Sequence, residues 1–487
     1  MIEKLKQNWF SNVRGDVLAG IVVALALIPE AIAFSIIAGV DPMVGLYASF
    51  CIAVVTAFVG GRPGMISGAT GAMALLMVPL VKDHGLDYLL AATILTGVIQ
   101  LLFGVFKVAR LMKFIPRAVM IGFVNALAIL IFMAQVPHFI GISTMTYIFV
   151  GITLVIVYLL PRFFKAIPAP LVAIVVLTAV AILSGVKLGT VGDLGNITQS
   201  LPSFLIPNVP FNLETLQIIF PYSIALAIVG LLESLLTASI VDDMTATDSN
   251  KNKEARGQGI ANVITGCFGG MAGCAMLGQA VINVKSGGRG RLSTLVSGVF
   301  LMFLIIVLGG LVVQIPMAVL VGIMIMVSIG TFDWSSFSYL RKAPKSDAVV
   351  MLATVILVVA THDLSKGVLI GVILSAIFFV AKISKVNVQY REMNNQSRFQ
   401  VEGQLFFASV ESFVDSFNFS VQQSEIVIDF SNAHIWDDSA VGAIDKVVIK
   451  YRENDNQVIV KGLNSASKKI VDKLAIYNDP NAKLSAH

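Results

Sequence analysis

Long apolar runs, broken by short charged or turn-rich stretches, fill most of the chain. A helix that crosses a bilayer needs about 20 apolar residues, and the pattern predicts two sets of seven such segments. We expect the first set near 16–38, 43–60, 66–81, 87–106, 116–135, 145–160 and 168–187. After a polar stretch, we expect the second near 217–240, 258–272, 275–285, 292–314, 317–338, 346–361 and 366–382. The third and tenth segments are short and contain glycine, so they are not expected to be ordinary spanning helices.

The pattern changes near residue 385, where short apolar strands begin to alternate with helical spacing. "EIVIDFS" and "QVIVKGL" have the pattern of strands, and "SAVGAIDKVVIKYREN" has that of a helix. Such alternation predicts a small α/β domain. Lys/Arg outnumber Asp/Glu by 24 to 16 up to residue 385, whereas beyond it Asp/Glu outnumber Lys/Arg by 13 to 10. We therefore expect a transmembrane domain over 1–385 and a soluble domain over 386–487.

Composition and loop charge agree with this division. Of the 487 residues, 56% are apolar and 13% charged, whereas soluble domains are nearer 45–50% apolar and about 25% charged. Basic residues cluster in alternate loops, and they favour the cytoplasmic side. This predicts a bilayer-embedded plasma-membrane protein with both termini in the cytoplasm. The basic clusters lie at 107–117, 251–256, 285–291 and 341–345.

The two sets of segments resemble one another. Glu30 and Glu233 are 203 residues apart, and two short segments begin near Ala69 and Ala275, 206 apart. Seven is an odd number, so repeats of seven spans at about 10–190 and 215–385 must be inverted in the membrane, a layout known in transporters. The alternative is chance similarity between apolar segments.

Glycine and proline interrupt both short segments. "GGRPGMISGATGAM" and "GCFGGMAGCAMLGQ" cannot hold regular helices throughout, so each is expected to begin a half-helix near mid-membrane. Two facing helix N-termini offer unpaired N–H groups and partial positive charge, which bind an anion without Lys or Arg. The alternative is close packing of small residues between helices. The candidate anion-binding residues are Ser67, Thr70, Gly71, Ala72, Ala275, Met276 and Leu277, of which Thr70 is equally a candidate N-cap.

Glu30 and Glu233 are the acids at mid-span. A charge at that depth costs about 2.5–3.5 kcal/mol or more, and such residues usually serve ion or proton pathways. Either is therefore a candidate for proton coupling, or else a neutral structural glutamate. Glu233 and Thr237 share one helix face and are an alternative sodium site. Gln279 and Asn283 either line the cavity or bind another helix.

Other chemistry is not indicated. The cysteines Cys51, Cys267 and Cys274 have no metal or redox spacing and are expected to be small core residues. No catalytic triad, cofactor motif or metal cluster is present in the sequence, so neither an enzyme nor a nucleic-acid partner is expected. The expected partners are a small anion, a proton or sodium ion and the bilayer, with the chain forming a homodimer.

These strings resemble the SulP family of sulfate-permease-like anion transporters, over nearly the whole chain. The resemblance is carried by "VRGDVLAGIVVALALIPEAIAF", "GGRPGMISGATGAM" and "GLLESLLTASIVDD", and the tail resembles a STAS domain. It implies fourteen spans in two inverted repeats, arranged as a core and a gate as in uracil permeases. It also implies substrates such as sulfate, bicarbonate, chloride or dicarboxylates, with proton or sodium symport in bacterial members.

The resemblance assigns roles to individual residues. Glu30 in "IPEAIAF" lies where many members have a coupling acid, and Glu233 and Thr237 in "ESLLT" lie where a sodium-coupled bicarbonate branch has Asp and Thr. That branch has a threonine where this chain reads Ala275-Met276-Leu277, and "EPTGPM" where this chain has "GATGAM". We therefore expect coupled transport of a sulfate-like oxyanion by elevator or rocking motion. Alternatives are a bicarbonate or dicarboxylate symporter or exchanger, an uncoupled anion channel, a nucleobase permease and a scaffold for the tail.

In the tail, "VIDFSNAHIWDDSAVGAI" resembles the STAS loop where anti-sigma antagonists carry a phosphorylated serine, and Ser439 occupies that position. Ser439 is thus a candidate regulatory site, and the domain a candidate docking site for a cytoplasmic protein. Asp437 and Asp438 make the loop acidic, and the alternative role for Ser439 is a helix N-cap.

Overall fold

The computed structural model divides the chain into two compact units, Met1–Val372 and Ile373–His487. It describes residues 8–108, 115–163, 168–193, 195, 197–393, 396–420, 425–479 and 482. The chain is mostly helical, and the expected helical membrane part followed by a small sheet-containing part is confirmed.

Each of the fourteen expected segments overlaps a helix. The first set comprises α2 (Val13–Ala38), α3 (Pro42–Val59), α4 (Gly71–His84), α5 (Leu86–Val105), α6 (Arg117–Phe139), α7 (Thr144–Phe163) and α8 (Ala169–Ser184). The second comprises α9 (Leu213–Thr245), α10 (Lys251–Cys267), α11 (Leu277–Lys285), α12 (Arg291–Val312), α13 (Met317–Thr331), α15 (Lys345–Thr361) and α16 (Leu364–Ile383). A short helix, α14 (Ser336–Lys342), and a 3-10 turn, η2 (Val191–Asp193), lie in connections.

By length and composition, nine helices in the described part of the chain can cross a membrane, and Ala169–Ser184 is a shorter apolar helix. The number of membrane crossings stays a prediction. The expected range 258–272 is wrong for α10, which is Lys251–Cys267. Its polar first turns form helix because Asn250 caps them, accepting a hydrogen bond from Lys253 N at 2.9 Å.

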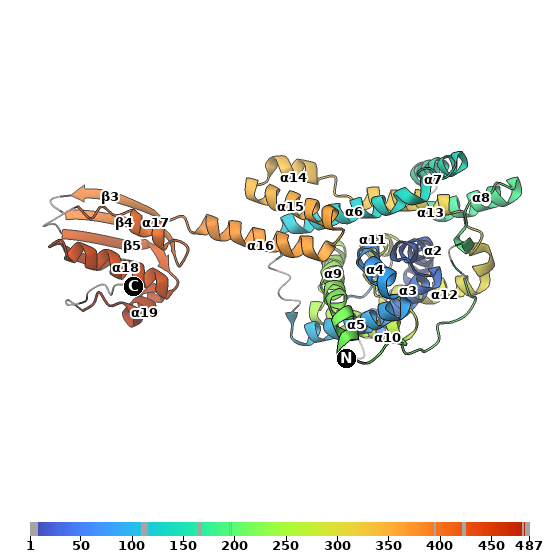
Figure 1. The fold of residues 1–487 in the computed structure, drawn as a ribbon, viewed down its shortest axis with the longest axis horizontal. Coiled ribbons are helices and arrows are strands. Elements are labelled where there is room, and N and C mark those ends of the chain that lie inside the picture. Colours follow the sequence, from blue (N-terminus) through green and yellow to red (C-terminus); the bar gives the residue numbers. More distant parts are fainter. Residues whose placement is uncertain are drawn as a thin grey trace. The chain divides into compact units, whose positions relative to one another are not determined.

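The helices of the membrane unit form two groups. α2 to α5 pack with α9 to α12, and α6, α7, α8, α13 and α15 pack with one another. Figure 1 shows the two groups as separate layers. Packing follows a two-fold pattern, because α5 lies on α10 as α12 lies on α3, and α13 contacts α7 as α6 contacts α15. Equivalent helices of the two sets therefore occupy equivalent places in the fold.

The C-terminal unit contains a four-stranded sheet in the order β3-β4-β5-β6. β3 (Asn387–Met393) is antiparallel to β4 (Gln396–Leu405), whereas β4, β5 (Glu425–Ile435) and β6 (Gln457–Lys461) are parallel. The helices are α17 (Val410–Asp415), α18 (Asp438–Arg452) and α19 (Ser465–Leu474). The unit has its own apolar core, which includes Phe399, Phe413, Ile428, Ile444 and Tyr451.

Candidate functional site

Two short strands join the two sets of helices at the site. β1 (Ser67–Gly68) pairs antiparallel with β2 (Cys274–Ala275), with Ser67 opposite Ala275 and Gly68 opposite Cys274. Each strand leads into a half-helix, β1 into α4 and β2 into α11. Because paired antiparallel strands run in opposite directions, the two half-helices leave this ladder in opposite directions and their N-termini meet beside it.

The half-helix α4 starts at Gly71, within the expected range Ala69–Ala72, whereas α11 starts at Leu277, two residues after the expected Ala275. The start of α11 is later because Ala275 is extended and paired with Ser67. The ladder also needs Gly273, since a Cβ there would lie 2.1 Å from the carbonyl oxygen of Gly68. Glycine is thus required here for close approach of two backbones.

Glu233 of α9 receives two hydrogen bonds at the start of α4. The Cys274 thiol donates to Glu233 Oε2 at 2.9 Å, and the Thr70 hydroxyl lies 3.4 Å from the same oxygen. Thr70 also caps α4, accepting from Met73 N at 3.4 Å, as expected for an N-cap, while its role as an anion ligand stays a prediction. Thr70 Oγ1 and Cys274 Sγ are 3.2 Å apart. These contacts join the two sets of helices at one carboxylate.

The role of Cys274 was not predicted from the sequence, where it was expected to be a small core residue. It is buried, but its thiol is a donor in the site. The 206-residue offset between the half-helices was the available signal, because the same offset pairs Gly68 with Cys274. The residue type alone gave no such indication.

Glu30 of α2 contacts the other half-helix. Gln279 of α11 donates to Glu30 Oε1 at 2.7 Å, and the Gln279 side chain is buried. Glu30 therefore touches the half-helix of the second set, as Glu233 touches the N-cap of the half-helix of the first. The two acids flank the two N-termini from opposite sets.

The other candidate residues are held by neighbours. The Ser67 hydroxyl is fully buried and accepts from Gln258 Nε2 at 2.8 Å. Ala275 N donates to Ser234 Oγ at 3.0 Å, and Met276 N donates to the Ile66 carbonyl at 2.9 Å. Gly71 and Ala72 form the buried first turn of α4, while Leu277, at the start of α11, is partly exposed.

The Asn283 side chain has hydrogen-bond partners in the described part of the chain, whereas the Thr237 hydroxyl has none. Asn283 Nδ2 donates to the Gly64 carbonyl and to Ser293 Oγ, each at 2.8 Å, so Asn283 binds neighbouring segments. The Thr237 hydroxyl is buried one turn after Glu233 and forms no hydrogen bond with the part of the chain that the structure describes.

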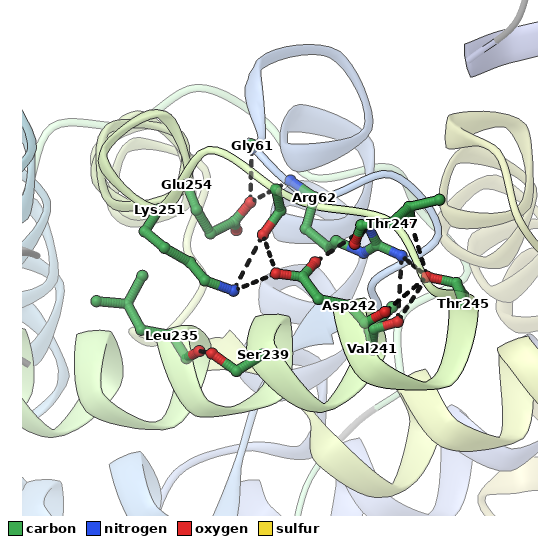
Figure 2. A network of polar contacts seen from close by, with 11 residues as sticks. Gly61, Arg62, Leu235, Ser239, Val241, Asp242, Thr245, Thr247, Lys251 and Glu254 are labelled. Atoms are coloured by element: carbon green, nitrogen blue, oxygen red, sulfur yellow. Dashed lines mark hydrogen bonds and ion pairs between the residues drawn. The ribbon is translucent and has the colours of Figure 1, made fainter. Parts of the chain in front are cut away.

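A polar network holds the loop that precedes β1 (Figure 2). Arg62 forms an ion pair with Asp242 at 3.1 Å, and Lys251 pairs with the same carboxylate at 2.7 Å. The Arg62 guanidinium also donates to the hydroxyls of Thr245 and Thr247. The Arg62 charge is therefore paired at the end of α9. It is a structural charge that secures the loop.

In the C-terminal unit, Asp437 caps α18, accepting from Ala440 N at 2.9 Å. The alternative that made Ser439 the N-cap is therefore wrong. Ser439 lies in the first turn of α18 with an exposed side chain. The Asp437 carboxylate also accepts a hydrogen bond from Phe407 N at 2.8 Å. This second bond connects the start of α18 to the segment after β4.

Residues 13–151 and 142–354 match the sulfate permease family, and residues 387–486 match the STAS domain. The chain belongs to the sulfate permease family. It is 64% identical to the putative sulfate transporter YbaR of Bacillus subtilis, over 97% of this chain and 99% of that protein. It is also 26% identical to the bicarbonate transporter BicA of Picosynechococcus, over 96% of this chain and 92% of that protein.

Solved structures extend the comparison. The transmembrane domain of a cyanobacterial bicarbonate transporter, BicA, is 29% identical, with a TM-score of 0.65 over 75% of this chain and 98% of that one. The murine Slc26a9 anion transporter in the inward-facing state shares the fold at 17% identity, with a TM-score of 0.83 over 97% of this chain and 89% of that one. The family relatives carry the names of transporters, which agrees with the expectation that this multi-span membrane protein is not an enzyme.

Proposed function

We propose that this family member is a secondary active transporter of a small anion, with a sulfate-like oxyanion as first candidate. In this proposal, residues 1–385 form the transport domain and 386–487 the STAS domain. The observation that carries the proposal is the β1–β2 ladder, from which two half-helix N-termini meet between Glu30 and Glu233. Such N-termini attract an anion through their free N–H groups and dipoles.

The substrate would lie at the first turns of α4 and α11. Main-chain N–H groups at Gly71, Ala72 and Leu277 are the proposed donors, because the first N–H groups of a helix have no partner within it. The Arg62 guanidinium is paired with Asp242. Binding by helix termini rather than by a basic side chain would hold the anion weakly enough for release.

Glu30 and Glu233 are the proposed coupling residues. A carboxylate beside the anion would repel it, whereas a protonated carboxyl would not, so proton and anion binding would favour one another. The two layers of helices would then move relative to each other, by elevator or rocking motion, and carry the site across the membrane.

The contacts of Glu233 favour a proton over sodium. Sodium is a hard cation and prefers oxygen ligands, whereas a thiol is a soft ligand. The group at 2.9 Å from Glu233 Oε2 is the Cys274 thiol, and the Thr70 hydroxyl is farther, at 3.4 Å. Thr237, whose hydroxyl has no hydrogen-bond partner among the described residues, is the one feature that favours sodium.

Bicarbonate is the second candidate substrate, and the specific observation in its favour is the 29% identity to the BicA transmembrane domain. Dicarboxylate transport, anion exchange and an uncoupled channel remain alternatives for the same fold. For the remaining architecture we propose fourteen segments in the membrane, both termini in the cytoplasm, a homodimer, and a cytoplasmic protein partner for the STAS domain, with Ser439 as its regulatory position.

The experiment is uptake into proteoliposomes that contain the purified protein. Labelled sulfate, bicarbonate and succinate are each tested under an imposed proton gradient, an imposed sodium gradient and no gradient. We expect accumulation of one anion above equilibrium with the proton gradient alone. Equilibration that no gradient changes would make the protein a channel, and accumulation driven only by sodium would overturn the proton assignment.

A further inference from the structure

A row of three buried polar side chains lies along α10. Glu254, Gln258 and Asn262 are four residues apart, so they share one face of the helix. Their exposed fractions are 1%, 0% and 0%. Buried polar groups of this kind are costly unless they are hydrogen-bonded, and each of the three has partners outside α10. We call these three residues the α10 polar row.

The first member holds the loop before β1. Glu254 Oε2 accepts from Gly61 N at 2.6 Å and from Arg62 N at 2.9 Å. Figure 2 shows this carboxylate beside the loop whose Arg62 side chain is paired with Asp242. Hydrogen bonds to a charged carboxylate oxygen are stronger than those between neutral groups, and here two successive N–H groups donate to the same oxygen. They fix the entry of the chain into β1.

The second and third members hold the two strands themselves. Gln258 Nε2 donates to Ser67 Oγ of β1 and to Glu254 Oε1, each at 2.8 Å. Asn262 forms hydrogen bonds with both the N–H and the carbonyl of Gly273, the residue before β2. Its Oδ1 accepts from Gly273 N at 2.9 Å, and its Nδ2 donates to the Gly273 carbonyl at 3.0 Å. Gln258 thus reaches β1 and Asn262 reaches the start of β2.

The spacing of the row matches the ladder. Four residues of helix rise about 6 Å, and paired strands lie about 4.8 Å apart, so successive members of the row can each reach one strand. The helix is itself held closely by α5. A Cβ on Gly97 of α5 would lie 2.5 Å from the carbonyl oxygen of Gly259 of α10, so the two backbones are in direct contact. The row therefore projects from a firmly supported helix.

We propose that the α10 polar row positions both half-helix N-termini and so sets the affinity of the anion site, although none of its members contacts the anion. This inference rests on the proposed function, because the affinity it describes is that of the proposed site. Gln258 binds a hydroxyl of β1, and Asn262 binds both backbone groups of the residue before β2, so one helix places both strands. Gln258 and Asn262 are positioning residues in this assignment.

The first experiment compares Gln258→Leu, Asn262→Leu and the conservative Asn262→Asp with wild type in proteoliposomes. Asn262→Asp keeps the acceptor for Gly273 N and loses the donor to the Gly273 carbonyl and to Gln100 Oε1. For whichever of sulfate, bicarbonate and succinate the wild type takes up, we expect both leucine variants to raise KM at least tenfold while the maximal rate stays within threefold. Asn262→Asp should give a smaller rise. Thr265→Val is the matched control, since the Thr265 hydroxyl donates to the Ala261 carbonyl of its own helix and the backbone bonds of Thr265 are unchanged by the substitution.

The second experiment does not depend on transport. In a background with Cys51→Ala and Cys267→Ala, Cys274 is the remaining thiol of the three in the chain. It is fully buried beside Gly273. We expect the leucine variants to raise the rate of Cys274 labelling by N-ethylmaleimide at least tenfold, and Thr265→Val to leave it within twofold.

The outcomes separate the two proposals. If the wild type takes up none of the three anions, the proposed function is wrong, and the labelling rates still decide whether the row holds β2. Unchanged labelling in both leucine variants would contradict the proposal that the row positions β2. An equal increase in the labelling rate of Thr265→Val would contradict it too. If the leucine variants do not fold, Asn262→Asp decides: unchanged KM and unchanged labelling in that variant would overturn the proposal.

Discussion

The Cys274 thiol donates a hydrogen bond to Glu233 Oε2 at 2.9 Å, beside the point where the two sets of helices meet. Cys274 belongs to β2, and Glu233 to α9. The same thiol lies 3.2 Å from the Thr70 hydroxyl, which caps α4. One small side chain therefore links a proposed coupling acid to the beginning of a half-helix.

Replacing Cys274 tests this link. Cys274→Ala removes the donor and leaves Glu233 with the more distant Thr70 hydroxyl, so we expect the initial rate of proton-driven uptake to fall severalfold. Cys274→Ser keeps a donor and should retain most of the rate. The measurement is initial uptake in proteoliposomes at matched protein content. Equal rates in the alanine and serine variants would show that the hydrogen bond does not matter.

Glu30→Gln tests proton coupling. Gln279 Nε2 donates to Glu30 Oε1 at 2.7 Å, and an amide oxygen in the same place accepts that bond equally well. The variant should therefore fold normally but cannot bind and release a proton. We expect loss of accumulation under a proton gradient, measured beside thermal unfolding of the purified protein. Wild-type accumulation in Glu30→Gln would remove Glu30 from the coupling mechanism.

Thr237→Val distinguishes the coupling ions. The Thr237 hydroxyl is buried and without a hydrogen-bond partner in the described part of the chain, so its replacement by a methyl group leaves no partner unpaired and should not destabilise the fold. If a proton is coupled, uptake should stay within threefold of wild type and remain independent of sodium. Loss of a sodium-dependent component in this variant would instead establish a sodium site at Glu233 and Thr237.

Gly273→Ala tests the β1–β2 ladder. A methyl group there would meet the Gly68 carbonyl oxygen at 2.1 Å, so the strands must separate or shift. We expect the free energy of unfolding to fall by at least about 2 kcal/mol, as for overpacked cores, and uptake to be lost. Gly151→Ala on α7 is the control, because nothing lies within 4 Å of its added Cβ. Similar behaviour of the two variants would contradict the tight approach.

Hydropathy and glycine patterns predicted much of this fold, because a bilayer imposes long apolar helices and half-helices need a break in the pattern. The start of the second half-helix was wrong by two residues, since strand pairing with the distant Ser67 extends Ala275. The α10 polar row was missed for a similar reason. Glu254 fell outside the expected segment 258–272, and its partner Arg62 lies 192 residues away. Periodicity within one helix cannot indicate which distant backbone its polar face will bind.

The STAS domain offers a prediction at acidic pH. Burial raises the pKa of Asp429, but hydrogen bonds from Ser431 and Arg398 outweigh this and bring the pKa to about 2. An unfolded Asp titrates near about 3.9. Because the folded value is lower, the carboxylate stabilises the domain above about pH 4, and this stabilisation is lost as the pH falls through about 2.

Asp429→Asn should remove this dependence. The Arg398 guanidinium donates to Asp429 Oδ2 at 2.5 Å, and loss of hydrogen bonds to a charged group costs about 1.5–3 kcal/mol. We therefore expect the variant to be less stable by about that amount at pH 7, with a flatter stability curve between pH 4 and 2. Urea unfolding of the STAS domain, residues 386–487, which has its own core, measures both. Asp415→Asn, at an exposed position on α17, is the control and should leave the curve unchanged. An equally steep loss of stability in Asp429→Asn would assign the acid sensitivity to other carboxylates.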